Sequence, residues 1–122
     1  MALVAVVAAA LSLVAAAAAD DGHDEGERRV RCSGGSEARL RVRARDGVLS
    51  VELELRPARA GRTWRVIVLH ERRTAARSVI RLGSGGRLRR QLPDWLGTDT
   101  VAARATAAAG EACRVAVTVR GR

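Results

Sequence analysis

The stretch EARLRVRARDGVLSVELELR, residues 37–56, decides the fold. Residues 37–45 alternate strictly between charged side chains and small or apolar ones, and residues 49–56 alternate between apolar side chains and polar or charged ones. A period of two is typical of β-strands with one buried face. Asp46-Gly47 lies between them and favours a two-residue type I′ turn, because Gly readily adopts the positive φ needed there and Asp tolerates it. The stretch therefore predicts an antiparallel β-hairpin.

Both faces of this hairpin agree on one register. Folding about the turn places Leu40 opposite Leu53 on the apolar face and Arg41 opposite Glu52 on the charged face. A slip of one residue would move every side chain to the other face, so the register is strongly specified.

Further alternating segments predict an all-β protein. Together with the hairpin they give seven or eight strands at a spacing typical of a β-sandwich. Residues 63–70 carry Trp64 and Val66 on one face and Ile67 and Leu69 on the other, which predicts a central strand covered on both sides. The other segments are residues 28–33, 78–82, 87–92, 99–107 and 112–120.

An uncharged run at the start of the chain predicts export. Residues 3–14 are mostly apolar, residues 15–19 are all Ala, and polar residues follow abruptly, which is the order of a secretory signal peptide. The run lacks the usual basic start, and an uncleaved membrane anchor is the alternative. We expect a signal peptide at residues 1–19, a flexible acidic linker at residues 20–27 and one folded β-sandwich domain at residues 28–122.

The chain has two cysteines, Cys32 and Cys113. In an oxidising compartment they predict one disulfide between the first and last strands. Closing a loop between positions 81 apart contributes about 4–5 kcal/mol in the chain-entropy model. The large aromatic residues are Trp64 and Trp95, with no Tyr or Phe. We expect Trp64 to anchor the core and Trp95 to close one end of the sandwich, and an exposed contact residue is the alternative for Trp95.

All 22 basic residues are Arg, and the net charge is +9. The absence of Lys indicates a GC-rich codon bias, which weakens the charge as evidence for a ligand. Alternate hairpin positions project guanidinium groups from one face about 7 Å apart, suited to bidentate bonds with phosphate or sulfate. Glutamates oppose half of them, so the row is either a solvated face or an anion site. These candidate residues, the arginine stripe, are Arg39, Arg41, Arg43 and Arg45.

No motif indicates catalysis, a metal or a cofactor. Residues 83–86, Gly-Ser-Gly-Gly, lack a following Lys and a helix, so they predict a hairpin loop and not a phosphate-binding loop. His23 lies in the acidic linker, where nothing preorganises a metal site. His70 ends a strand without a second His or a Cys nearby, and we expect it at the surface.

Three features carry a resemblance. Cys32 stands near the mature start, Trp64 lies on a strand, and Gly110-Glu111-Ala112-Cys113 stands near the end. Residues 94–101 resemble the corner before the penultimate strand of immunoglobulin-like domains, although the Tyr usual at that corner is missing. Residues 28–122 thus resemble small secreted bacterial immunoglobulin-like or fibronectin-III-like β-sandwich proteins of unassigned activity. The resemblance implies a fold and no reaction.

These observations predict a secreted or cell-envelope module that binds a partner or serves a structural role and is not an enzyme. The expected partner is an extracellular protein or an anionic polymer, such as polyphosphate, an acidic glycan or nucleic acid. Sequence-specific nucleic-acid recognition is not expected, and few aromatic side chains are available to stack bases. An inhibitor of an extracellular hydrolase, presenting a rigid loop, is the alternative.

Overall fold

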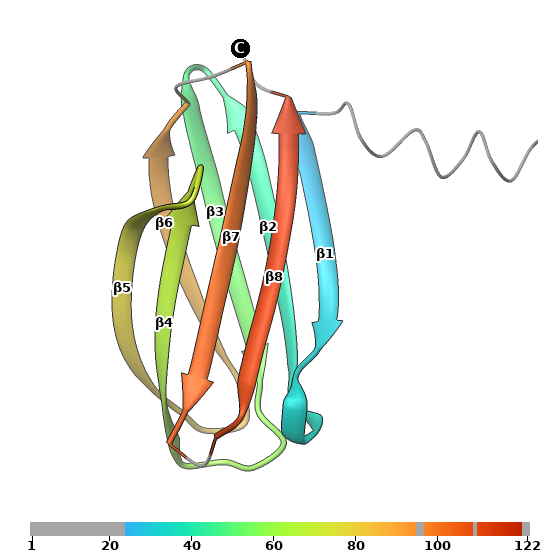
Figure 1. Cartoon of the computed structure of the whole chain (residues 1–122), viewed down its shortest axis with the longest axis vertical. Helices are drawn as coiled ribbons and strands as arrows, with labels where there is room; N and C mark the ends of the chain where they lie inside the picture. Colours follow the sequence, from blue (N-terminus) through green and yellow to red (C-terminus); the bar gives the residue numbers. More distant parts are fainter. Residues whose placement is uncertain (1–23, 95–96, 109, 121–122) are drawn as a thin grey trace, which may run out of the picture.

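The computed structural model describes residues 24–94, 97–108 and 110–120, and within them eight β-strands form two antiparallel sheets (Figure 1). The predicted signal peptide and Trp95 lie outside the described residues. The first sheet, in strand order, contains β1 (Glu25–Arg31), β2 (Glu37–Arg45), β3 (Val48–Arg56) and β6 (Gly86–Pro93). The second contains β5 (Arg73–Leu82), β4 (Arg62–His70), β7 (Thr98–Ala107) and β8 (Ala112–Arg120).

The predicted hairpin is confirmed as β2 and β3, in the predicted register. Leu40 pairs with Leu53, and Arg41 pairs with Glu52. Asp46 and Gly47 have φ angles of 54° and 77°, as a type I′ turn requires. The alternation of the sequence therefore determines both the pairing and the face that is buried.

Strand β1 begins at Glu25, three residues before the expected start of the domain. Glu25 pairs with Arg43 of β2, so the end of the predicted linker belongs to the sheet. Gly26 explains how β1 approaches the second sheet, because a Cβ built there would lie 2.6 Å from Val117 Cγ1 of β8. The close approach needs a residue without a side chain.

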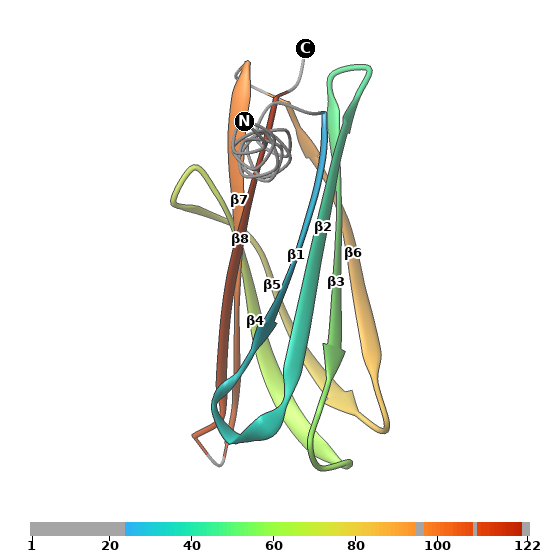
Figure 2. The ribbon, with the colours of Figure 1, turned by 90° about the vertical axis from the view of Figure 1, so that its right-hand side faces the viewer.

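The core lies between the two sheets, which face each other as layers in Figure 2. Trp64 of β4 is fully buried within it, surrounded mainly by Val, Leu and Ala from both sheets. The prediction that β4 is covered on both sides is not confirmed. Ile67 and Leu69 lie on its outer face and are half-buried, with no further layer over them among the described residues.

The predicted disulfide is present and joins the two sheets. Cys32 directly follows β1 and Cys113 lies in β8, with their Cα atoms 4.4 Å apart. Nearby, the buried carboxylate of Glu111 accepts hydrogen bonds from Ser36 Oγ at 2.8 Å and from Arg62 Nη1 at 2.7 Å. A covalent bond and a buried polar network thus hold the same end of the sandwich.

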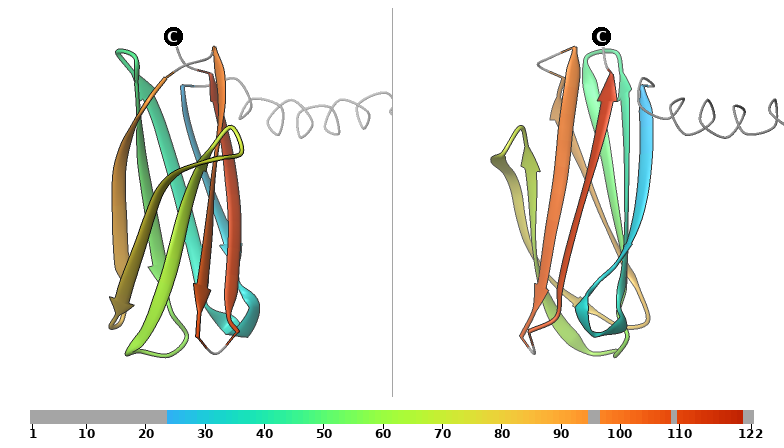
Figure 3. Two further views of the ribbon diagram at one scale, coloured as in Figure 1. Left: turned by 60° about the vertical axis from the view of Figure 1, so that its left-hand side comes forward. Right: turned by 45° about the vertical axis from the view of Figure 1, so that its right-hand side comes forward.

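The segment of residues 83–86 is not a hairpin loop. Residues 83–85 connect β5 to β6, which begins at Gly86, and these strands belong to different sheets. The hairpin of β4 and β5 bends outward from the first sheet, as Figures 2 and 3 show. Arg90 of β6 donates a hydrogen bond to Ser78 Oγ of β5 at 2.8 Å and so bridges the two edge strands.

Candidate anion-binding faces and a buried histidine cluster

The arginine stripe lies on the outer face of the first sheet, where most of it is paired with carboxylates. Glu25 accepts hydrogen bonds from Arg41 and Arg43, each at 3.0 Å. Arg39 lies 3.6 Å from the nearer oxygen of Glu54. Arg45 is exposed at the end of β2 and forms no ion pair within the described part of the chain.

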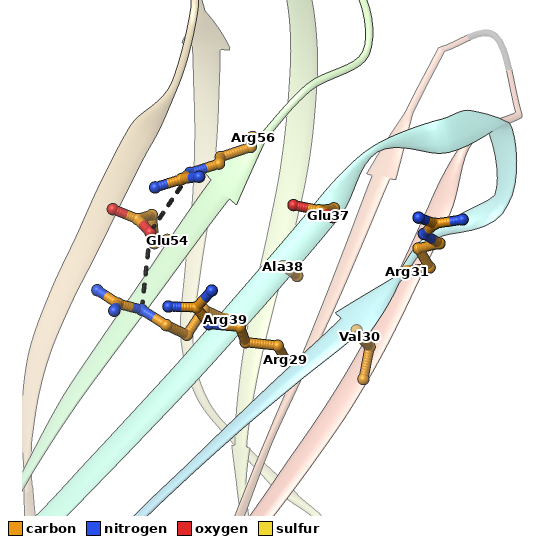
Figure 4. Close-up of a pocket in the computed structure, with 8 residues that line it drawn as sticks. All are labelled: Arg29, Val30, Arg31, Glu37, Ala38, Arg39, Glu54 and Arg56. Carbon is orange, nitrogen blue, oxygen red and sulfur yellow. Dashed lines mark ion pairs between the residues drawn. The ribbon is translucent and has the colours of Figure 1, made fainter.

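Strand β6 extends this network. Arg87 Nε lies 3.2 Å from Glu54, and Arg89 Nε lies 2.9 Å from Glu52. Figure 4 shows Glu54 between two arginines in a pocket of about 220 Å³. We call the outer face of the first sheet the paired face. Seven of its nine arginines lie within 4.0 Å of a carboxylate oxygen, namely Arg29, Arg39, Arg41, Arg43, Arg56, Arg87 and Arg89.

Two glutamates of the paired face, Glu25 and Glu54, have lowered pKa values, which favours their charged form. Burial acts to raise the pKa of Glu54, but the hydrogen bond from Arg87 and the nearby arginine charges outweigh it and lower that pKa. The pKa of Glu25 is lowered chiefly by the hydrogen bonds from Arg41 and Arg43. Ion pairs between neighbouring strands therefore involve most of the charged side chains of this face.

The outer face of the second sheet has no such compensation. No strand residue that points outward on it is acidic. None of its arginines lies within 4.0 Å of a carboxylate oxygen among residues 24–94, 97–108 and 110–120. We call this surface the arginine face. Its six exposed arginines are Arg65, Arg77, Arg81, Arg104, Arg114 and Arg120.

Three of these arginines lie in one row across the strands. Arg77 of β5 pairs with Ile67 of β4, Ile67 pairs with Arg104 of β7, and Arg104 pairs with Arg114 of β8. Directly opposite residues of antiparallel strands have Cα atoms about 4.5–5.5 Å apart. Arg65 lies two residues along β4 from Ile67, which adds a fourth guanidinium beside the row.

A depression of about 730 Å³ lies beside the row. Its lining includes the small side chains of Ala102 and Ala116, the arginines Arg104 and Arg114, and one acidic residue, Glu71. Small residues between guanidinium groups leave room for a chain of oxyanions to approach the sheet. Because no carboxylate oxygen of the described residues lies within 4.0 Å of these arginines, their donors are available to phosphate, sulfate or carboxylate groups.

His70 is not at the surface, contrary to the expectation from sequence. Its side chain is 1% exposed, and its Nε2 lies 2.7 Å from Oδ1 of Asp99, which is 0% exposed. His70 continues the inward positions of Trp64 and Val66 along β4, and Asp99 occupies the same inward face as Val101 on β7. The alternation itself is the signal that would have indicated burial.

Glu71 completes a cluster at this end of β4. Its backbone N–H donates to the Thr100 carbonyl oxygen at 3.0 Å, and its side chain accepts a hydrogen bond from the Thr100 N–H. Glu71 and Arg72 both have positive φ, 51° and 69°, which is uncommon for residues other than Gly, Asn and Asp. One potential metal-ligand atom each of His70, Glu71 and Asp99 lies within 4.8 Å of the others.

Comparisons with known proteins give no relative from which to transfer a function. No known protein family, curated protein or solved structure matches the chain. Across the described residues, no helix has the length and apolar character to cross a membrane.

Proposed function

We propose that this protein is a non-catalytic binding module for linear polyanions and that it works in the cell envelope or outside the cell. The arginine face is its binding surface. The ligand class is a chain of repeated phosphate, sulfate or carboxylate groups, bound by charge and hydrogen bonding without recognition of bases. The disulfide is compatible with an oxidising location.

One observation carries the proposal, which is the segregation of carboxylates between the two outer faces. Nine arginines on the paired face accompany five outward glutamates, whereas the six on the arginine face accompany none on its strands. Codon bias explains Arg in place of Lys but does not explain where Glu is placed. Like charges directly opposite on neighbouring strands are destabilising, and an anionic ligand would relieve that repulsion for Arg104 and Arg114.

The arginine face is therefore preferred to the arginine stripe as the binding site. Three of the four stripe residues already have carboxylate partners, which a ligand would have to displace. On the arginine face a ligand displaces only water and counterions, and counterion release favours binding.

We also propose an immunoglobulin-like fold for the sandwich. Its two antiparallel sheets, the buried Trp64 on a central strand and the closeness of the first and last strands support it. Two features depart from the usual pattern. Strands β1 to β3 are consecutive neighbours, and the disulfide joins the end of β1 to β8 rather than two central strands.

The test compares two double variants with the same change of charge. Arg104→Gln/Arg114→Gln alters the arginine face, and Arg41→Gln/Arg43→Gln is the matched control on the paired face. Binding of each protein, with its disulfide intact, is measured by fluorescence anisotropy against labelled polyphosphate and a labelled heparin fragment. We expect the first variant to lose on the order of 10- to 100-fold in affinity and the control about twofold.

Salt dependence supplies a second measure of the same contacts. About four arginine contacts predict a slope of roughly −3 in a plot of log K against log salt concentration, using the coefficient for single-stranded polyanions. Equal losses in the two double variants would assign binding to overall charge and overturn the choice of face. No binding of wild-type protein to either polymer at low salt would overturn the proposed function.

A further inference from the structure

We propose that His70, Glu71 and Asp99 form a binding site for one divalent zinc ion at the end of β4. The site adjoins the depression of the arginine face, which Glu71 also lines, but its ligands are not the arginines proposed to bind a polyanion. It involves the buried side of the sandwich at His70 and Asp99 and reaches the surface at Glu71, which is half-buried.

The donor set indicates the metal. One imidazole nitrogen and two carboxylate oxygens are ligands that zinc accepts, with bonds of about 2.0–2.2 Å, whereas magnesium and calcium prefer oxygen ligands alone. Three protein ligands leave the fourth tetrahedral position to water. Two carboxylates also balance the charge of a divalent ion in a partly buried position.

The distances are close to those that a zinc ion requires. Ligand atoms around a tetrahedral zinc lie about 3.4 Å apart, from bond lengths near 2.1 Å. In the structure one potential ligand atom of each residue lies within 4.8 Å of the others. His70 Nε2 and Asp99 Oδ1 are 2.7 Å apart as a hydrogen-bonded pair, and an ion bound by both atoms would replace this hydrogen bond. Adjustments of about an ångström, chiefly in the longer and less buried Glu71 side chain, bring all three to an ion.

The state of Asp99 is the second observation that points to a cation. Its side chain is fully buried, and its Oδ2 has no hydrogen-bond partner within the described part of the chain. A buried carboxylate oxygen without a partner is costly, because it has lost its hydration and gained nothing in return. A bound cation would satisfy the carboxylate.

The experiment measures zinc binding to the metal-free, full-length protein by isothermal titration calorimetry. We expect one ion per chain and a rise in Tm of about 10 °C or more at a hundredfold excess of zinc over Kd. Glu71→Gln keeps an oxygen that can accept the Thr100 hydrogen bond and should lower the zinc affinity at least tenfold. Asp99→Asn should do the same if the variant folds, which circular dichroism establishes.

His23→Ala is the control, because His23 is the other histidine of the chain and lies among acidic residues. This variant should keep full zinc affinity. Cobalt substitution gives an independent reading, since a tetrahedral site produces intense visible absorption that Glu71→Gln should abolish. The proposal is overturned if wild-type protein binds no zinc, or if zinc binding disappears in His23→Ala and survives in Glu71→Gln.

Discussion

The outer faces of the two sheets both carry rows of arginine, but they treat this charge in opposite ways. On the paired face, Glu25, Glu52 and Glu54 each contact two or more guanidinium groups, so the strands are linked by ion pairs. On the arginine face, Arg104 and Arg114 stand directly opposite each other without a carboxylate partner. The first arrangement stabilises the sheet, and the second leaves positive charge available to a ligand.

The difference shows why counting arginines along a strand is a poor guide to an anion site. The stripe of β2 is the densest row of arginine in the sequence, yet its partners come from β1 and β3 and neutralise most of it. The arginine face takes one or two arginines from each of its four strands, which come from two separate parts of the sequence. What matters is whether carboxylates share the face.

The largest expected effect on stability comes from the disulfide, because this bond joins the two sheets that carry the two faces. The Cys32→Ser/Cys113→Ser double variant should lose about 4–5 kcal/mol of unfolding free energy, since the unfolded chain regains the freedom of an 81-residue loop. Urea denaturation measures this loss. A double variant as stable as wild type would show that the ion pairs and the core suffice to hold the two sheets together.

The two faces should also differ in how they affect the dependence of protein stability on acid pH. The pKa values of Glu25 and Glu54 in the folded protein lie below their ordinary value near 4.5. The unfolded chain therefore binds more protons at acid pH, so this stabilisation is complete above that value and is lost as pH falls through the lowered pKa values. Glu54→Gln should reduce the acid-dependent change in unfolding free energy, because one of the two carboxylates with a lowered pKa is then absent.

The control for the acid prediction lies on the arginine face. Arg104→Gln removes a charge that no carboxylate contacts among the described residues, so the pH dependence of its stability should match that of wild type. Denaturation midpoints measured from about pH 7 down to about pH 3 test both variants. An equal reduction of the pH dependence of stability in the two variants would contradict the distinction between the faces.

Much of the fold follows from the sequence, and most of the candidate sites do not. Alternation determined the β2–β3 register, the inward residues of β8 and the burial of Trp64. The pairing of β4 with β7, which lie far apart in sequence, has no local signal, so the row of Arg77, Arg104 and Arg114 could not be identified. The row is visible only from the sheet order, in which β4 lies between β5 and β7.

The histidine cluster teaches a related lesson. The alternation of the strand places His70 on the same face as Trp64, and this pattern is visible in the sequence. It indicates burial more reliably than the general tendency of isolated histidines to lie at the surface. Its contact with Asp99 depends on the pairing of β4 with β7, which places residues 29 positions apart side by side. Periodicity gives the face of a residue, whereas only topology gives its neighbour.

The smallest expected effect is also the most direct test of the comparison, because its sign differs between the faces. Arg114→Thr removes one of two opposed like charges, and Thr suits a strand, so the substitution should stabilise the protein by about 0.2–1 kcal/mol. Arg39→Thr removes a partner of Glu52 and Glu54 and should destabilise it by a similar amount. Because both variants exchange the same residue types on a strand, differences in β-propensity largely cancel, and urea midpoints should move in opposite directions. If both substitutions destabilise the protein equally, Arg114 stabilises the free protein. Its charge is then already used in the fold and is not available to a ligand.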